Sequence, residues 1–170
     1  MSIGGQSDVT PERKVYFLTP EGYRKKKERL EYLRTVKRQE VADFIHDAKE
    51  AGDISESGAY EEAKRQQAAV EGEILELEKL LASSEIMTAD DLQGPAVVRI
   101  GMQVEVETES GATRTFKIVE TYEADPKSGL ISDQSPVGKA LLGHKAGDVV
   151  SVSTPGGVTT YKILSVRPML

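Results

Sequence analysis

The sequence of 170 residues contains no cysteine, and only 5% of its residues are aromatic. Without cysteine, the chain has no disulfide framework, no thiolate metal ligand and no thiol nucleophile. Long hydrophobic runs are also missing, because runs such as residues 95–98 are far shorter than the roughly 20 residues of a membrane-spanning helix. The first residues show no basic-then-apolar signal segment. We therefore expect a cytoplasmic protein with no membrane association.

The composition, with 38% hydrophobic and 29% charged residues, is that of a globular chain with one or two small domains. The net charge of −6 is unevenly distributed: residues 12–38 carry ten Lys or Arg and four acids, whereas residues 40–78 carry twelve acids and three bases. From residue 96 onward, eight acids balance eight bases. Residues 40–78 are acidic and the part from residue 96 onward is balanced, so neither supplies the excess of cations that neutralises nucleic-acid phosphates. We therefore expect no tight binding to free nucleic acid.

Two long segments with helical periodicity predict an antiparallel hairpin. The first begins at Thr19, which can cap a helix, and Pro20, which suits the first helical position, and it runs to about Glu50. Its apolar positions are mostly three, four or seven apart, and the second segment keeps a 3-4 spacing typical of a coiled coil. The apolar positions of the first segment are Tyr23, Leu30, Leu33, Val41, Phe44 and Ala48. The seam positions of the second segment are Tyr60, Ala63, the polar Gln67, Val70, Ile74, Leu77 and Leu81.

The segment between these helices, residues 52–60, carries two carboxylates, Asp53 and Glu56. Acids at the far end of a hairpin are better placed to enter another molecule's site than to line a core, and carboxylate oxygens suit hard cations. The same Asp-x-x-Glu spacing is also that of a capping box at the start of the second helix, and this alternative needs no metal. A purely structural spacer is a further alternative for the hairpin.

The composition changes at residues 89–95, and beyond this predicted linker the period changes from 3.6 to 2. Val104 and Val106 alternate with acidic residues in a half-buried strand, while Ser135 and Pro136 resemble the cap and first residue of a short helix. Further strands are expected around residues 116–118, 149–152 and 159–166. The predicted fold class is α+β: a long antiparallel coiled-coil hairpin followed by a small antiparallel β-sheet domain with one short helix. The predicted division is a flexible lead at 1–16, the hairpin at 17–88, a linker at 89–95 and a second domain at 96–170.

Three separated motifs resemble those of a known family, and Gly147-Asp148 and residues 154–157 add to the resemblance. They are Leu-Thr-Pro-Glu-Gly at residues 18–22, Ala-Lys-Glu-Ala-Gly-Asp-Ile-Ser-Glu at residues 48–56, and Ser-Pro-Val-Gly-Lys-Ala-Leu-Leu-Gly at residues 135–143. In this order they resemble the bacterial GreA/GreB transcript-cleavage factors, from about residue 15 to residue 166. The resemblance implies a hairpin that enters the secondary channel of RNA polymerase, and an FKBP-like second domain that docks on the rim of that channel.

The resemblance also implies roles for particular residues. Asp53 and Glu56 would help the polymerase hold a second Mg²⁺ and a water, so that backtracked RNA is hydrolysed and arrested complexes are rescued. The chain would then be an accessory factor rather than an enzyme, with weak or no Mg²⁺ binding of its own. The residues expected near the 3′ end of the nascent RNA are Lys49, Ser57, Tyr60, Lys64 and, as an extension of the family pattern, Arg65. The residues expected to dock on the polymerase are Gln134, Ser135 and Pro136.

Two alternatives remain open from the sequence. Ser57-Gly58-Ala59 stands where the family commonly has Asn-Ala-Glu. Because of this difference, the first alternative is that the chain is a regulator that occupies the channel and inhibits the polymerase without cleavage activity. The FKBP-like resemblance leaves a prolyl isomerase or folding helper as the second alternative. An isomerase groove needs a cluster of aromatic residues, however, and the C-terminal half contains only Phe116, Tyr122 and Tyr161.

Overall fold

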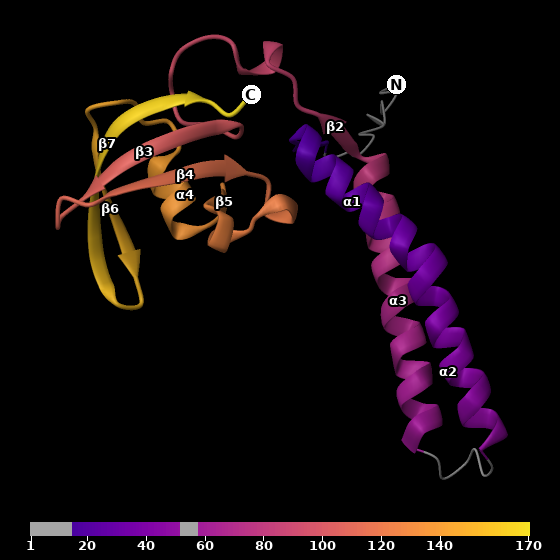
Figure 1. Ribbon diagram of the computed structural model, residues 1–170. Coiled ribbons are helices and arrows are strands. Elements are labelled where there is room, and N and C mark those ends of the chain that lie inside the picture. The colour runs from indigo at the N-terminus through magenta and orange to yellow at the C-terminus, as the bar shows by residue number, and fades with distance from the viewer. Residues whose placement is uncertain (1–14, 52–57) are drawn as a thin grey trace, which may run out of the picture.

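The computed structural model of the protein describes residues 15–51 and 58–170, which form two parts (Figure 1). A long helical hairpin extends away from a domain built on a curled five-stranded sheet. The α+β fold class predicted from the sequence is therefore confirmed. Among the described residues, no helix is both long enough and apolar enough to cross a membrane.

The hairpin has one arm made of a nearly continuous helix and a second arm made of a single helix. The first arm consists of α1 (Pro20–Tyr32), a π-helical turn η1 (Leu33–Lys37) and α2 (Arg38–Glu50), and the second arm is α3 (Gly58–Ala82). Both arms have the positions and approximate lengths that the sequence pattern predicts. The hairpin is thus a thin, elongated element rather than a compact domain.

The start of the first arm follows from its local sequence. The Thr19 hydroxyl oxygen accepts a hydrogen bond from the backbone N–H of Gly22 at 3.0 Å, and Pro20 occupies the first helical position. This contact satisfies one of the backbone donors that lack a partner at a helix N-terminus. The helix start predicted at Thr19 is therefore confirmed.

The two arms pack through an apolar seam along their facing sides. Its buried residues are Leu30, Leu33, Val41, Val70, Ile74 and Leu77, with Ile45 and Leu81 partly buried beside them. Toward the far end, the buried residues are alanines, Ala48 on α2 and Ala63 on α3. Small side chains permit a close approach of the two helices at this end of the hairpin. Gln67 and Tyr60 are only half-buried.

The π-helical turn accounts for an irregular spacing in the first arm. Leu33 and Val41 are both buried in the seam although they are eight residues apart, whereas two turns of α-helix take about seven residues. At the turn, the backbone N–H of Arg38 donates to the carbonyl of Leu33, five residues earlier. One additional residue is thereby accommodated, and the seam stays aligned with α3 on both sides of the turn.

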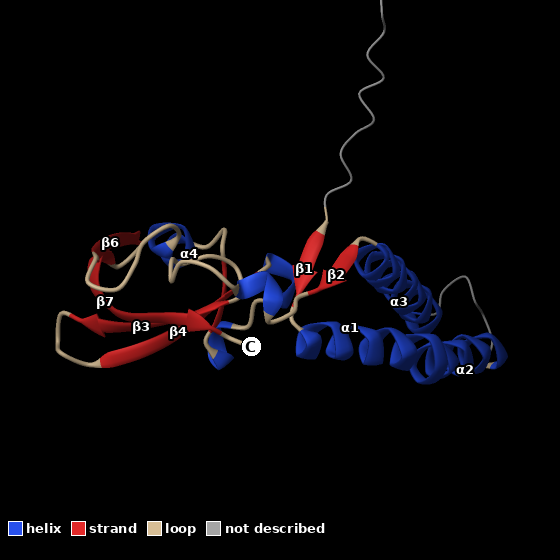
Figure 2. Ribbon diagram, turned by 90° about the horizontal axis from the view of Figure 1, so that it is seen from above, coloured by secondary structure: helices blue, strands red, loops and turns tan. Residues whose placement is uncertain are grey.

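A small two-stranded sheet closes the base of the hairpin. Its strands, β1 (Tyr16–Leu18) and β2 (Ser84–Ile86), pair in parallel and lie between the helices and the larger sheet (Figure 2). The sequence pattern did not predict them, because three residues are too few to show a period. The predicted flexible lead at 1–16 lies outside the described residues up to residue 14, and its last residue is the first of β1.

The C-terminal domain is a five-stranded sheet in the order β5-β4-β3-β7-β6. Its strands are β3 (Met102–Thr108), β4 (Thr113–Val119), β5 (Leu130–Ser132), β6 (Val149–Thr154) and β7 (Gly157–Pro168). Three of the four strand pairs are antiparallel, as predicted, but β4 and β5 pair in parallel. The short strand β5 was not predicted, because it follows the loop region that contains two 3-10 turns, η3 (Thr121–Glu123) and η4 (Pro126–Ser128).

The sheet domain has its own apolar core, which includes the single helix α4 (Pro136–Leu141). Val104 and Val106 of β3 are fully buried together with Ile118 of β4 and Leu141 of α4. Met87 and Leu92, from the connection that follows the hairpin, also belong to this core. The connection, which contains the 3-10 turn η2 (Asp90–Leu92), is therefore packed against the domain that it leads into.

Candidate functional site

The functional residues predicted from the sequence fall into two groups that lie at opposite ends of the molecule (Figure 1). One group surrounds the far end of the hairpin, where α2 ends and α3 begins. The predicted catalytic residues Asp53 and Glu56, and the predicted RNA-proximal Ser57, lie outside the described residues. The other group surrounds the start of α4 in the sheet domain. Contacts with a partner at one end can therefore be changed without touching the other end.

The predicted RNA-proximal cations lie on the two helices that flank the acidic segment. Lys49 is exposed in the last turn of α2, where a cation suits the helix dipole. On α3, the Lys64 ammonium donates to Gln67 Oε1 at 2.9 Å, and Arg65 Nη1 donates to Glu62 Oε2 at 2.7 Å. These contacts are exposed and within one helix, so the cations can exchange them for contacts with an anionic partner at little cost.

Tyr60 lies in the first turn of α3 and is half-buried. The hairpin covers part of its side chain, which is consistent with its place in the predicted seam. Part of the residue remains exposed to solvent. The geometry thus accommodates a packing role and a stacking role together.

Acids along the stem of the hairpin are held by arginines from the opposite arm. Arg29 donates from Nε and Nη2 to the two carboxylate oxygens of Glu73 at 2.9 and 3.2 Å, and Arg38 makes the same paired contact with Glu71 at 2.9 Å each. Hydrogen bonding to these guanidinium groups lowers the pKa of the Glu73 and Glu71 carboxyls below their ordinary values. These carboxylates therefore join the two arms of the hairpin.

Within residues 15–51 and 58–170, no group of three or more His, Cys, Asp or Glu side chains is arranged to hold a metal ion. The residues predicted to hold Mg²⁺, Asp53 and Glu56, lie outside these ranges. Two carboxylates are a suitable donor set for Mg²⁺ but supply fewer ligands than its octahedral shell requires. The remaining ligands would come from a partner.

The predicted docking residues lie in the turn that starts α4. The Ser135 hydroxyl accepts from the backbone N–H of Gly138 at 3.1 Å and donates to the carbonyl of Ser132 at 2.7 Å, and Pro136 takes the first helical position. The predicted cap is therefore confirmed. A Cβ atom at Gly138 would lie only 2.0 Å from the Ser132 carbonyl oxygen, so this turn requires glycine there.

The exposed side of the same turn carries Gln134 and Pro136. Gln134 Nε2 donates to Asp133 Oδ2 at 3.0 Å, and its backbone N–H donates to the hydroxyl of Ser132 at 3.0 Å. Because Ser135 holds the turn while Gln134 and Pro136 face solvent, the segment presents a fixed, exposed shape. Such a surface suits recognition by another protein.

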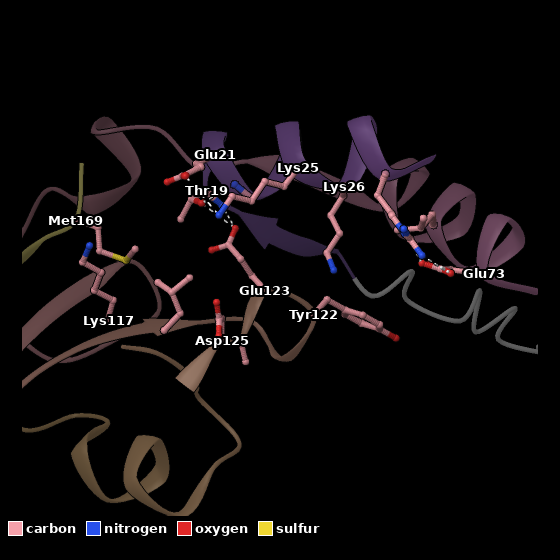
Figure 3. Close-up of a pocket in the computed structure, with 15 residues that line it drawn as sticks. Thr19, Glu21, Lys25, Lys26, Glu73, Lys117, Tyr122, Glu123, Asp125 and Met169 are labelled. Atoms are coloured by element: carbon pink, nitrogen blue, oxygen red, sulfur yellow. Dashed lines mark hydrogen bonds and ion pairs between the residues drawn. The ribbon is translucent and has the colours of Figure 1, made fainter. Parts of the chain in front are cut away.

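A feature that the sequence analysis missed lies at the junction of the two parts. A cavity of about 300 Å³ opens between α1 and the sheet domain, and Glu123 points across it toward Thr19 (Figure 3). Glu123 Oε1 accepts from the Thr19 backbone N–H at 3.0 Å and from the Thr19 hydroxyl at 2.7 Å. One sequence signal was present: Gly22 lies inside a helix, where glycine is unfavourable and usually has a packing reason.

Comparisons with known proteins cover both parts of the chain. Residues 16–86 match the family described as "Transcription elongation factor, N-terminal", and residues 93–168 match the family described as "Transcription elongation factor, GreA/GreB, C-term". The first match spans the hairpin with its small two-stranded sheet, and the second spans the sheet domain.

Individual relatives have nearly the same length as this chain. The chain is 48% identical over 155 residues to Transcription elongation factor GreA of Thermoanaerobacter pseudethanolicus, covering 91% of this chain and 98% of that protein. It is 47% identical to the protein of the same name from Chloroflexus aurantiacus, with the same coverage. Among solved structures, GreA factor homolog 1 of Thermus thermophilus is 32% identical, covering 91% of this chain and 99% of that one, with a TM-score of 0.43.

Proposed function

The chain belongs to the GreA/GreB family of transcription elongation factors, and we propose that it stimulates the cleavage of backtracked RNA by RNA polymerase. The observation that carries this proposal is the hairpin, whose arms are matched by the N-terminal family and are joined through residues 52–57, which contain Asp53 and Glu56. The described part of the hairpin is a pair of long helices packed side by side. Its chemistry would take place inside another molecule.

The dimensions of the hairpin support insertion into a channel. At 1.5 Å per residue, the 25 residues of α3 extend about 37 Å. Only two helices lie side by side over most of this length, so the element is narrow. We infer that it enters the secondary channel of the polymerase and carries the acids to the polymerase active site.

In this proposal, Asp53 and Glu56 add two carboxylates to the metal site of the polymerase. When bound there, a second Mg²⁺ would supply an activated water and charge stabilisation for phosphodiester hydrolysis. Since two carboxylates alone hold Mg²⁺ weakly, the acids contribute only once the hairpin is seated. The factor completes the site of another enzyme and, on its own, turns over no substrate.

The other predicted residues have supporting roles in the same complex. Lys49, Lys64 and Arg65, exposed beside the acids, would neutralise phosphates near the RNA 3′ end, with Ser57 and Tyr60 close by. Gln134, Ser135 and Pro136 would hold the sheet domain on the rim of the channel. Contact with nucleic acid is expected only within the elongation complex, which also makes the cytoplasm the expected place of action.

The alternative of an inhibitor without cleavage activity is not favoured, because the curated relatives that match over 91% of the chain are named GreA. The isomerase alternative has no support from the matched families, both of which are described as transcription elongation factors.

The proposal is tested by RNA cleavage in stalled, backtracked elongation complexes. Asp53→Asn should lower the cleavage rate by about 100-fold or more, since metal-ligand interactions contribute several kcal/mol to a transition state. Binding to the polymerase should stay unchanged. Asp47→Asn makes the same chemical change at an exposed position on α2 and serves as the control. Equal cleavage by Asp53→Asn and the wild type would reject the assignment.

A further inference from the structure

We propose that Glu123 is a positioning residue that sets the direction in which the hairpin leaves the sheet domain. This inference rests on the proposed function, in which the sheet domain holds the polymerase while the hairpin reaches its active site. Glu123 belongs to η3, close after strand β4, and is thus attached to the sheet through a short segment of chain. Its carboxylate contacts the beginning of the hairpin.

The Glu123 carboxylate directly contacts Thr19, the residue that caps the N-terminus of α1. Its Oε1 atom accepts two hydrogen bonds from Thr19, whose hydroxyl also accepts from the backbone N–H of Gly22 in the first turn of the helix. Thr19 is only 7% exposed, and these bonds are partly shielded from water. A carboxylate at a helix N-terminus is also favoured by the helix dipole. A carboxylate of the sheet domain and the helix cap therefore form one hydrogen-bonded unit.

Gly22 makes this approach possible. A Cβ atom placed on Gly22 would lie 1.6 Å from Glu123 Oε1 and 2.3 Å from its Cδ atom. No side chain larger than hydrogen fits while Glu123 keeps its position. Addition of one methyl group at residue 22 would thus displace the Glu123 carboxylate and break its hydrogen bonds to Thr19.

Two neighbouring contacts also join the sheet domain to the base of the hairpin. Glu120 Oε1 accepts from the backbone N–H of Phe17 at 3.4 Å, and the rings of Tyr16 and Tyr122 meet edge to face at 5.0 Å. The space beside them is a cavity of about 300 Å³ with many charged side chains around it, including Lys26 and Lys117, rather than a packed apolar interface (Figure 3). The orientation of the hairpin therefore depends strongly on the direct contacts.

A small change at this junction has a large effect at the far end. A rotation of about 5° at the base would move a point about 37 Å along the hairpin by about 3 Å. A displacement of about 1 Å can already lower the rate of a catalysed reaction by about 100-fold. The angle that Glu123 sets thus determines whether the acids reach a productive position.

The test measures this angle directly in the full chain. Since the sequence has no cysteine, Ala69→Cys on α3 and Ser151→Cys on β6, both exposed, allow two spin labels and a distance measurement between the two parts. The variants are Glu123→Ala, Gly22→Ala and the two combined. The matched controls are Gly72→Ala, where a Cβ atom meets nothing within 4 Å, and Glu109→Ala in the exposed turn after β3.

Each single variant should shift or broaden the distance distribution, whereas the controls should match the wild type. In the combined variant the added methyl group no longer meets Glu123, so its distribution should resemble that of Glu123→Ala alone. In backtracked complexes, the maximal cleavage rate of the single variants should fall about tenfold or more. The factor concentration for half-maximal cleavage should stay constant, because the docking surface is intact.

Unchanged distances in both single variants would overturn the proposal, as would altered distances with wild-type cleavage rates. Circular dichroism checks that the helical content is preserved, and Gly22→Ala tests the contact if Glu123→Ala does not fold. Absence of cleavage by the wild-type factor would reject the proposed function instead. The distance measurement would then still decide whether Glu123 orients the hairpin.

Discussion

Among the described residues of the hairpin, three glycines occupy helical positions, and their surroundings differ. Gly58 and Gly72 lie on α3 with nothing within 4 Å of the place where a Cβ atom would be. Gly22 lies on α1 against the carboxylate of Glu123. Glycine inside a helix costs about 1 kcal/mol relative to alanine. At Gly72 that cost has no compensating contact, whereas at Gly22 it is offset by the close approach of Glu123.

The same substitution should therefore have different effects at two helical glycines. Gly72→Ala should raise the stability of the protein by about 0.5–1 kcal/mol, because only helix propensity changes. Gly22→Ala should bring no such gain, since the new methyl group displaces Glu123. Thermal unfolding followed by circular dichroism measures both. An equal rise in Tm for the two variants would show that Glu123 does not constrain residue 22.

At the scale of the elements, the π-helical turn keeps the buried residues on both sides of it in one seam facing α3. If residues 33–41 formed regular α-helix with the sequence unchanged, Glu40 would take the seam position that Val41 now occupies. Val36, within the turn, is 47% exposed and makes no part of the buried seam. The turn therefore accommodates one residue that the α-helical repeat does not need.

Deletion of Val36 should convert the turn into regular α-helix and leave the seam aligned. Deletion of Gly72, also exposed, should instead rotate Ile74 and Leu77 by about 100° relative to Val70 and remove them from the seam. We expect the first variant to unfold near the wild-type Tm and the second far below it. Comparable losses of Tm in the two deletion variants would contradict this account of the turn.

The elements differ in how well the sequence predicts them. The caps at Thr19 and Ser135 and the long seam were predictable, because local hydrogen bonding and periodicity determine them. The three-residue strands β1, β2 and β5 carry no readable period, and their pairing depends on segments far apart in the chain. The contact of Glu123 with Thr19 spans 104 residues and has no local pattern beyond the unexplained glycine.

At the scale of the whole molecule, recognition and chemistry are assigned to opposite ends. The start of α4 presents a fixed turn on the sheet domain, and the hairpin extends away from that domain to the end of α2 and the start of α3 (Figure 1). The junction at Glu123 lies between the two. A factor built in this way can tolerate changes in docking, in orientation and in chemistry separately, so variants at each place should affect a different measured quantity.

The most direct test of the account is the Mg²⁺ dependence of RNA cleavage in backtracked complexes, because the acids are proposed to help the polymerase hold a second Mg²⁺. The wild-type factor should reach half-maximal cleavage at a lower Mg²⁺ concentration than the variant Asp53→Asn/Glu56→Gln. The variant should resemble complexes without any factor. An identical Mg²⁺ midpoint for the wild type and the variant would contradict the claim that these two carboxylates complete the metal site.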